Sequence, residues 1–327
     1  EGYHDAAYPE RAAVLHRGST LAGSYVIQLT NADDVTIEYL SITGGEYGVY
    51  AATGSDSDNL IVSTSGVYGN AKDGLHLESS NDFVVVSHNT IFDNSQYGIY
   101  LAGNARAVVS ENQIYGNNYG GISATGPSLA ADRIVISGNT VRDNAQGIYV
   151  SSNVLVTENI VTGNFNAFGI SVLFSSAEAS DNVVYGNATG INAASGAVVR
   201  NNRVYANSLF GIVASDGGTQ IADNLIYSNP IGIDAFNLTA TPLNVLNNSV
   251  YANSNQGIRL RGVQNSNFYN STFNVANNTV YQPTGDAIRV QDYAKSSMLR
   301  NNILWVEAGY AINVANDSQV GVNSDYN

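Results

Sequence analysis

Residues 182–193 read NVVYGNATGINA, and residues 202–214 read NRVYANSLFGIVA. Each stretch contains two phrases, Asn-x-aliphatic-x-x-Asn followed by Gly-Ile-x-apolar. The second phrase recurs down most of the chain at steps of about 21 to 30 residues. It begins at Gly48, Gly74, Gly98, Gly121, Gly147, Gly169, Gly190, Gly211, Gly232 and Gly257, and continues with alanine in place of glycine at Ala287 and Ala311. Repeats of this length are typical of a solenoid, in which each repeat packs against its neighbours.

Apolar residues alternate with variable residues in the Gly-Ile phrase, which indicates a strand and not a helix. The residue after the glycine is always aliphatic, as in Val49, Ile99 and Ile170, and the residue two places further on is always apolar. The residue between them varies freely, so we expect it to face solvent while its two neighbours face the core. No segment of ten or more residues has the pattern of a capped amphipathic helix.

These patterns predict an all-β protein, a parallel β-helix of about twelve coils with strands stacked about 4.8 Å apart. The asparagine that ends each Asn phrase falls at a turn, where stacked side-chain amides can form a ladder. We expect each glycine to allow a tight bend before its strand. The β-helix is predicted at residues 24–327, and residues 1–23 are predicted to be an irregular segment or a partial cap.

The chain is acidic, with a formal net charge of −14, which argues against nucleic acid as a partner. No apolar run is long enough to span a membrane. The chain has no cysteine, so cysteine usage leaves the redox compartment open. The terminal coils look uncapped, from which we expect end-to-end self-association through exposed strands.

The variable residues of the Gly-Ile phrase should form an outward row across successive coils. This row places His76 between Tyr50 and Tyr100, with Tyr149 two repeats further on. Ionisable residues flank His76 in the sequence, which makes this the densest titratable group in the chain. The predicted catalytic residues are Tyr50, Lys72, Asp73, His76, Glu78 and Tyr100.

Two interpretations of this group were open. Histidine, tyrosine and lysine transfer protons, and a neighbouring carboxylate tunes their pKa. The functional interpretation is a proton-abstraction site for the C5 proton of a uronic acid, with Lys72 neutralising the sugar carboxylate, tyrosine rings meeting the sugar faces, and His76 or a tyrosine taking the proton. The alternative is a solvated outer face, stabilised by ring stacking and ion pairs.

A second charged group lies in the later repeats. Its arginines, with Tyr149, are the predicted substrate-binding residues: Tyr149, Arg259, Arg261 and Arg289. Arginines on adjacent coils can clamp a carboxylate or a sulfate. The alternative is an ion-pair ladder with Asp234, Asp286 and Asp292, which we favour because exposed pairs are common and weak.

A third outward row is aromatic and ends at Trp305. It runs through Tyr68, Phe92, Tyr115, Tyr185, Tyr205, Tyr227, Tyr251, Tyr281 and Trp305. Such rings can hold sugars, but stacking between identical rings favours a purely stabilising role.

No firm cofactor or metal ligand is predicted. Calcium is the one candidate cofactor, held loosely by Asp56 and Asp58 beside Asn59 in a polar loop.

The two phrases together resemble the repeats of the pectin-lyase-like superfamily, over about residues 24–320. The resemblance implies a right-handed, single-stranded β-helix, and it extends to proteins of the NosD type, mannuronan C5-epimerases and polysaccharide lyases. The epimerases carry Tyr-Gly-Phe-Asp-Pro-His, and residues 73–76 (DGLH) match it at Gly74 and Leu75. Asp73 stands at the family's tyrosine, His76 stands at its aspartate, and the Pro-His pair is missing.

Two functions therefore compete. One is a secreted or cell-surface protein that binds or modifies an acidic polysaccharide, as a lyase or an epimerase does. The other is a structural β-solenoid segment of a large extracellular protein, without catalysis.

Overall fold

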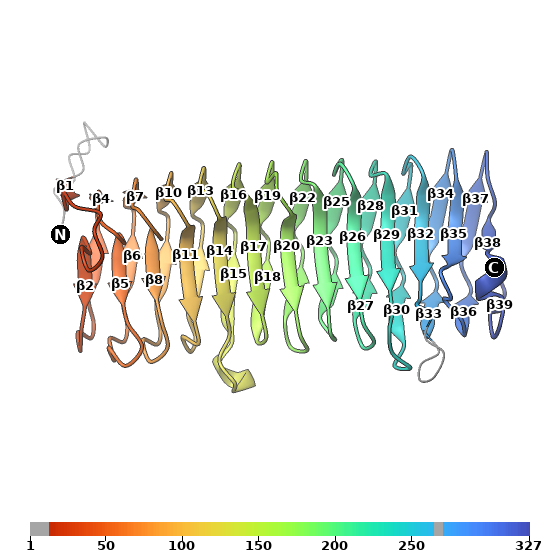
Figure 1. Cartoon of the computed structure of the whole chain (residues 1–327), viewed down its shortest axis with the longest axis horizontal. Coiled ribbons are helices and arrows are strands. Elements are labelled where there is room, and N and C mark those ends of the chain that lie inside the picture. Colours follow the sequence, from red (N-terminus) through yellow and green to blue (C-terminus); the bar gives the residue numbers. More distant parts are fainter. Residues whose placement is uncertain (1–12, 265–270) are drawn as a thin grey trace. The chain divides into compact units, whose positions relative to one another are not determined.

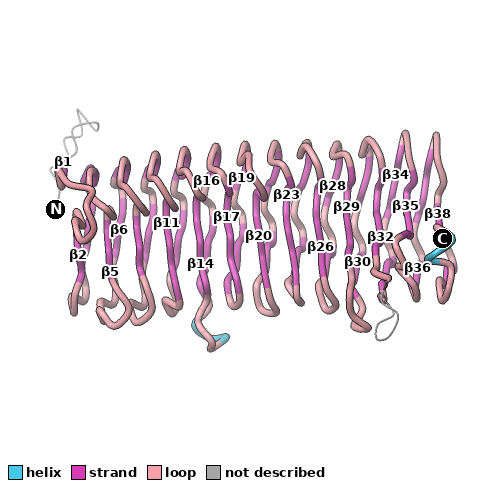
Figure 2. The backbone as a smooth tube through the Cα atoms, in the orientation of Figure 1, coloured by secondary structure: helices cyan, strands magenta, loops and turns pink. Residues whose placement is uncertain are grey.

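The computed structural model describes residues 13–264 and 271–327. Within these ranges the chain forms 39 strands and two short 3₁₀ helices, η1 (Ala130–Asp132) and η2 (Asn316–Ser318). The strands repeat in the order sheet A, sheet B, sheet C, and strands of successive coils pair in parallel (Figures 1 and 2). The predicted all-β parallel β-helix is confirmed. No helix in the described ranges is long and apolar enough to cross a membrane.

The described residues fall into two compact units, and unit 1 ends at Asn166. Its sheet A contains β1 (Ala13–His16), β4 (Leu40–Thr43), β7 (Gly66–Tyr68), β10 (Thr90–Phe92), β13 (Gln113–Tyr115), β16 (Thr140–Arg142) and β19 (Ile160–Thr162). Its sheet B contains β2 (Ile27–Leu29), β5 (Val49–Ala51), β8 (Leu75–Leu77), β11 (Tyr97–Ala102), β14 (Gly120–Thr125) and β17 (Gln146–Ser151). Its sheet C contains β3 (Thr36–Glu38), β6 (Ile61–Ser63), β9 (Val85–Ser87), β12 (Val108–Ser110), β15 (Ile134–Ser137) and β18 (Val154–Thr157).

Unit 2 comprises Ala167–Asn327 and is built in the same way. Its sheet A contains β22 (Val183–Tyr185), β25 (Arg203–Tyr205), β28 (Leu225–Tyr227), β31 (Ser249–Tyr251), β34 (Thr279–Gln282) and β37 (Ile303–Val306). Its sheet B contains β20 (Phe168–Leu173), β23 (Thr189–Ala194), β26 (Phe210–Ser215), β29 (Ile231–Phe236), β32 (Gln256–Arg261), β35 (Asp286–Gln291) and β38 (Ile312–Val314). Its sheet C contains β21 (Glu178–Ser180), β24 (Val198–Arg200), β27 (Gln220–Ala222), β30 (Leu243–Leu246), β33 (Phe273–Ala276), β36 (Ser297–Arg300) and β39 (Asn323–Asp325).

The sequence phrases correspond to particular sheets. The Asn phrase supplies sheet A, and the Gly-Ile phrase supplies sheet B. Each sheet turns one aliphatic row inward, and residues such as Ile91, Ile99 and Val109 are fully buried there. The alternation that was read from the sequence therefore builds a core of close-packed Val, Ile and Leu side chains.

The chain completes thirteen rounds of the A–B–C pattern within the described ranges, one more than predicted. The first round lacks the Gly-Ile phrase, because Val26 precedes β2 where later coils have glycine. Sheet A begins within the segment predicted to be irregular or a partial cap, since β1 pairs with β4 as a strand of that sheet. The Gly-Ile phrase marks only sheet B, so it gave no sign of this earlier strand. Residues 1–12 of the expected cap lie outside the described residues.

Asparagine ladders hold the coils in register. Asn94 is representative, because its N–H and its Nδ2 both donate to Asn117 Oδ1, at 3.1 Å and 3.0 Å. The expected ladder, from the last asparagine of each phrase, runs in unit 1 through Asn70, Asn94, Asn117, Asn144 and Asn164. A second ladder, which the sequence analysis missed, uses the first asparagine and runs through Asn89, Asn112, Asn139 and Asn159. These asparagines are buried, so their hydrogen bonds satisfy backbone groups at two corners of each coil.

The expected role of the glycines is wrong. Gly74 does not have a positive φ; the tight bend lies instead at the residue before a ladder asparagine, such as Asp93, with φ 53°. A Cβ on Gly74 would lie 2.6 Å from the carbonyl oxygen of Gly98 in the next coil and 3.0 Å from Asn94 Nδ2. Glycine is therefore required here because the coils approach closely, and not because the chain bends.

We predict that Asn207→Ala destabilises the protein by about 2–4 kcal/mol, because buried groups on both sides lose partners. Asn187 N donates to Asn207 Oδ1 at 3.0 Å, and Asn207 Nδ2 donates to Asn229 Oδ1 at 3.0 Å. Urea unfolding followed by circular dichroism measures the loss. The matched control is Asn192→Ala on the outward row of the same unit, which should cost less than about 1 kcal/mol. Equal losses for the two variants would contradict a special role of the ladder.

Candidate functional site

The outward row of sheet B in unit 1 has the predicted register. Tyr50 on β5 pairs with His76 on β8, and His76 pairs with Tyr100 on β11. The His76 ring stacks on Tyr100 with centroids 4.6 Å apart and on Tyr50 with centroids 5.5 Å apart. Ser123 separates Tyr100 from Tyr149 in the row, so Tyr149 is not a direct neighbour of this stack.

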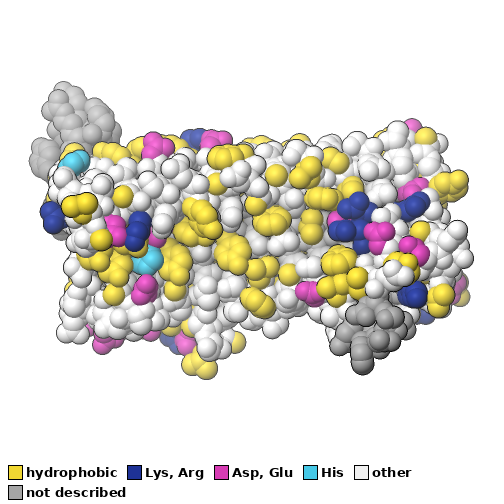
Figure 3. Space-filling view, viewed as in Figure 1, with side chains coloured by type: hydrophobic (Ala, Val, Ile, Leu, Met, Phe, Trp, Pro, Cys, Tyr) yellow, Lys and Arg dark blue, Asp and Glu magenta, His cyan; other side chains and the backbone are white. Residues whose placement is uncertain are grey.

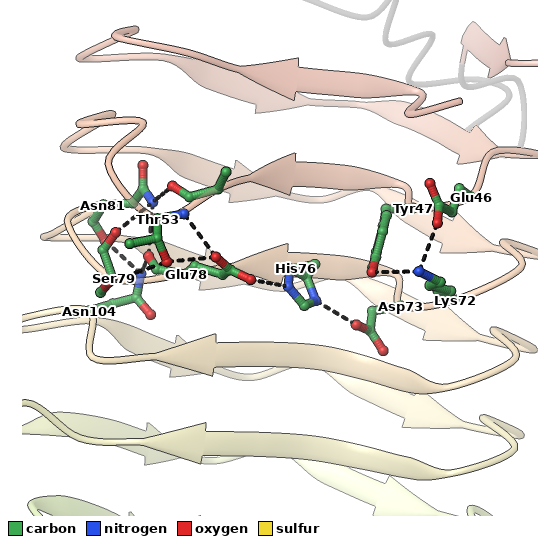
Figure 4. A network of polar contacts seen from close by, with 11 residues as sticks. Glu46, Tyr47, Thr53, Lys72, Asp73, His76, Glu78, Ser79, Asn81 and Asn104 are labelled. Carbon is green, nitrogen blue, oxygen red and sulfur yellow. Dashed lines mark hydrogen bonds and ion pairs between the residues drawn. The ribbon is translucent and has the colours of Figure 1, made fainter. Parts of the chain in front are cut away.

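His76 is held between two carboxylates of its own coil (Figure 4). Its Nδ1 lies 2.7 Å from Asp73 Oδ2, and its Nε2 lies 3.2 Å from Glu78 Oε1. Burial lowers the pKa of His76, but the hydrogen bonds to Asp73 and Glu78 outweigh burial and raise the pKa above its usual value. The arrangement therefore favours an imidazolium whose two N–H groups are both occupied.

The backbone of adjacent coils holds both carboxylates in place. Asp73 is buried, and its Oδ1 accepts a hydrogen bond from the N–H of Tyr97 at 2.8 Å. Glu78 Oε2 accepts bonds from Thr53 N at 2.9 Å and Thr53 Oγ1 at 2.6 Å. The bonds from Thr53, with that from His76, lower the pKa of Glu78. His76 is thus positioned by groups from three successive coils.

Lys72 points away from His76 toward the preceding coil (Figure 4). Its Nζ lies 2.7 Å from Glu46 Oε1 and donates to the Tyr47 hydroxyl at 3.2 Å. Glu46 is buried and also accepts a bond from Gly23 N at 2.6 Å. These bonds raise the pKa of Lys72, so the ammonium is retained and neutralises Glu46. Lys72 has a partner within the protein before any ligand binds.

Further aromatic rings surround the stack, and the sequence analysis did not single them out. Tyr25 stacks on Tyr50 at 4.2 Å, and Tyr47 lies 4.7 Å from the His76 ring. The Tyr97 ring lies 6.1 Å from the Tyr100 ring. The sequence contained a signal for these rings. In YGVY at 47–50 and YGIY at 97–100, the tyrosine before the glycine and the tyrosine two places after it both lie on this face.

Burial raises the pKa of these phenols. The effect raises the pKa of Tyr97 to about 12, and it also raises the pKa values of Tyr47 and Tyr50. These three phenols therefore stay protonated near neutral pH and are poorly suited to act as bases. Tyr50 lies between the rings of Tyr25 and His76, so its faces are used within the protein and the expected contact of tyrosine faces with sugar does not fit Tyr50.

The predicted substrate-binding arginines lie on sheet B of unit 2. Arg259 Nε and Arg261 Nε donate to Asp234 Oδ1 at 2.8 Å and 2.9 Å, and Arg261 Nη2 lies 2.6 Å from Asp234 Oδ2. Arg289 contacts Asp286 Oδ2 at 3.4 Å. Burial raises the pKa of Asp234, but the two arginines outweigh burial and lower it. Arg259 and Arg261 thus form short ion pairs, as the favoured ion-pair interpretation predicts, whereas the ion pair of Arg289 is longer.

The aromatic row on sheet A forms stacks of its own. In unit 2, Tyr185, Tyr205, Tyr227 and Tyr251 stack with centroids 4.9–5.0 Å apart. Each interior ring covers its neighbours, which favours the stabilising interpretation over sugar contact.

The calcium expectation at Asp56 and Asp58 stays a prediction. Asp58 Oδ1 accepts a bond from Asp82 N at 2.8 Å, within a ladder that includes Asp33. In residues 13–264 and 271–327, no three His, Cys, Asp or Glu side chains are grouped to hold a metal ion.

Comparison with known proteins identifies the family. Residues 25–178 and 168–325 match the right handed beta helix region, so the chain belongs to the right-handed β-helix family, and the predicted resemblance in fold is confirmed. Comparison with curated protein sequences finds no match.

Solved structures similar to this chain include two epimerase modules. They are the A-modules of the mannuronan C-5 epimerases AlgE4 and AlgE6 of Azotobacter vinelandii, each 12% identical with a TM-score of 0.63. Each match covers 89% of this chain, and they cover 91% of the AlgE4 module and 90% of the AlgE6 module. At this identity the likeness is one of fold.

We predict that His76 stabilises the protein most strongly at mildly acidic pH. Because the folded state raises its pKa above about 6.5, its contribution is fully present below that pH and is lost as pH rises through the folded value. Glu78 acts in the opposite sense. Its pKa is lowered in the folded state, so its contribution to the stability of the fold is lost as pH falls through that folded-state pKa. Urea unfolding of the parent and His76→Gln between about pH 5.5 and 9 should show a difference that shrinks as pH rises.

The matched control is His88→Gln. His88 is also paired with a carboxylate, Glu111 at 2.6 Å, but its side chain is 60% exposed. An exposed pair contributes little, so this variant should differ little from the parent at any pH. A pH-independent loss in His76→Gln would contradict the arrangement described for His76.

Proposed function

We propose that the chain is a secreted or cell-surface protein that binds polysaccharide across sheet B of unit 1, over the row Tyr50, His76 and Tyr100. The observation that carries the proposal is a histidine clamped by two carboxylates within a group of half-buried aromatic rings. Such a surface offers phenol hydroxyls and ring edges to sugar hydroxyls and C–H groups. Figure 3 shows yellow side chains gathered with histidine, acidic and basic groups toward the N-terminal part of this face.

The charge around His76 bears on which sugar units bind there. Three carboxylates, those of Glu46, Asp73 and Glu78, outnumber the two cationic groups of Lys72 and His76. A sugar carboxylate at His76 would meet net repulsion at short range. The site is better suited to a neutral part of a glycan, and an acidic group requires cations elsewhere.

Binding is the function that this geometry supports best, and lyase- or epimerase-like chemistry is the second candidate. Proton abstraction needs a free base, but both nitrogens of His76 are occupied and the pKa values of Tyr47, Tyr50 and Tyr97 are raised. Catalysis would require a ligand to draw Glu78 away from His76 Nε2. The contact between Glu78 and Nε2 is the longer of the two contacts that His76 makes with carboxylates. Glu78 is the more exposed of the two carboxylates, with a side chain 34% exposed against 3% for Asp73.

A structural segment without a glycan ligand is the competing proposal. The self-stacked tyrosines on sheet A of unit 2 support it, because their ring faces are used within the protein. Sedimentation at increasing concentration separates the proposals, since a rod that assembles should self-associate, whereas a binding protein should remain monomeric and take up a glycan.

We predict that Tyr100→Ala weakens glycan binding at least tenfold, because it removes one ring of the row and exposes His76. Titration calorimetry against neutral glycans, alginate and pectate measures the change. The matched control is Tyr205→Ala, which removes a stacked tyrosine from sheet A of unit 2 and should leave affinity unchanged. If neither the parent nor the variants bind any of these polymers, the proposal is wrong.

Activity is measured separately with the same polymers. Absorbance of unsaturated products detects a lyase, and exchange of the C5 proton detects an epimerase. If chemistry occurs at this site, His76→Ala should abolish it and Tyr100→Phe should reduce it. Turnover that persists unchanged in His76→Ala would place the chemistry elsewhere.

A further inference from the structure

The arginines of sheet B in unit 2 carry more cationic groups than their shared carboxylate neutralises. Asp234 is 1% exposed and receives hydrogen bonds from both Arg259 and Arg261. Arg289 lies directly opposite Arg259 on the adjacent strand, with β32 paired to β35. Like charges in opposed positions are unfavourable unless an anion lies between them.

The arginine side chains are already oriented. The Arg259 guanidinium lies over the Phe210 ring at 5.6 Å, and the Arg261 guanidinium lies over the Phe236 ring at 5.3 Å. Each guanidinium therefore contacts an aromatic ring and is bonded to Asp234. A group held in this way loses little conformational entropy when a ligand binds.

Hydrogen-bond donors remain available on two of these arginines. Among the described residues, Arg259 uses only its Nε toward a protein acceptor, which leaves both Nη groups. Arg289 donates from Nε to Gln291 and from Nη1 to Asp286, so its Nη2 remains. The side chains of Arg259 and Arg289 are 19% and 28% exposed, so a ligand reaching them would be partly shielded from water.

Each of the two arginines has one carboxylate partner, Asp234 for Arg259 and Asp286 for Arg289, and each keeps hydrogen-bond donors beyond that pair. Asp286 is engaged by Tyr310 N at 3.1 Å and Asn313 Nδ2 at 2.9 Å, and its contact with Arg289 is the longest of this group at 3.4 Å. Asp292 is exposed and accepts a bond from the Gln291 amide. Asp286 bonds Arg289 but not Arg259, and Asp292 bonds Gln291, so neither carboxylate bridges the two arginines. Figure 3 shows basic and acidic side chains gathered in such a group on the face where sheet B lies.

We propose that Arg259 and Arg289 form a two-arginine fork that binds the carboxylate of a uronic acid residue. Planar guanidinium groups match a carboxylate with paired N–H···O bonds, and two of them on adjacent strands can take one oxygen each or share both. Phe210, over which the Arg259 guanidinium lies, provides apolar surface beside the fork for the sugar ring. The choice of a glycan as ligand rests on the proposed function, whereas the anion site itself rests only on the residues of unit 2.

The test compares a charged ligand with its neutral counterpart. The probes are tetragalacturonate and the same oligosaccharide after reduction of its carboxyl groups, titrated calorimetrically at fixed salt. The parent should bind the charged form at least about tenfold more tightly, because charge-assisted hydrogen bonds are lost with the carboxylate. Arg289→Gln should abolish this difference without disturbing the pairs at Asp234, and Arg289→Lys should reduce it because the fork geometry is lost.

The matched control is Arg203→Gln on sheet A of the same unit, which removes the same charge where Arg203 bonds the Tyr227 hydroxyl. This variant should keep the preference for the charged form. Equal affinity for the two forms, or equal losses in Arg289→Gln and Arg203→Gln, would overturn the proposal. Tighter binding of a sulfated oligosaccharide with the same dependence on Arg289 would overturn the carboxylate assignment.

A further experiment distinguishes failure of this proposal from failure of the proposed function. Tyr100→Ala should weaken binding of the neutral oligosaccharide and leave the Arg289-dependent binding of tetragalacturonate in place, so it reports on the His76 site alone. Titration with free galacturonate, read by the NMR signals of the arginine Nε–H groups, tests the fork even if no oligosaccharide binds at His76. Shifts centred on Arg259 and Arg289 support the fork, and absent or uniform shifts among the arginines overturn it.

Discussion

Hydrogen bonds between stacked asparagine side chains are the interaction on which the other features of this protein depend. Each ladder Oδ1 accepts the backbone N–H of the equivalent asparagine in the preceding coil, so every coil must take the same path at that corner. A slip of one residue would turn the aliphatic rows outward and leave buried amides unpaired. Because the coils stay in register, outward residues of successive coils are aligned at the spacing of parallel strands.

The His76 site follows from this alignment. Its two carboxylates come from the same coil as the histidine, but the groups that hold those carboxylates come from the coils on either side, Thr53 before and Tyr97 after. The neighbouring rings are likewise contributed by different coils. A short local motif therefore becomes an ordered site only when three coils are stacked. Tyr97 also packs across the next coil against Gly120, where a Cβ would lie 2.8 Å from Tyr97 Cε1.

Buried carboxylates organise the cationic groups on sheet B. In unit 1, Asp73 holds His76, and in unit 2, Asp234 holds Arg259 and Arg261. Burial of a carboxylate is unfavourable unless it is paired, and here each one is paired with a cation and, for Asp73, also with a backbone N–H. The two places differ in the balance of charge. Three carboxylates face two cationic groups around His76, whereas the arginines Arg259, Arg261 and Arg289 are matched one for one by Asp234, Asp286 and Asp292. In a chain with a net charge of −14, the arginine group is a local exception that suits an anionic ligand.

The sequence by itself determined the solenoid, the inward aliphatic rows, one asparagine ladder and the order Tyr50–His76–Tyr100, because all of these follow from a repeated period and from the alternation of a strand. It did not reveal the strand β1 or the second ladder, and it misjudged Gly74, whose role depends on the approach of Gly98 in the next coil. Only the tertiary structure decided that Lys72 turns to Glu46 and that Asp234 is shared by two arginines. A repeat specifies where side chains start on the backbone, but which groups they reach depends on side-chain torsions and on distances between coils.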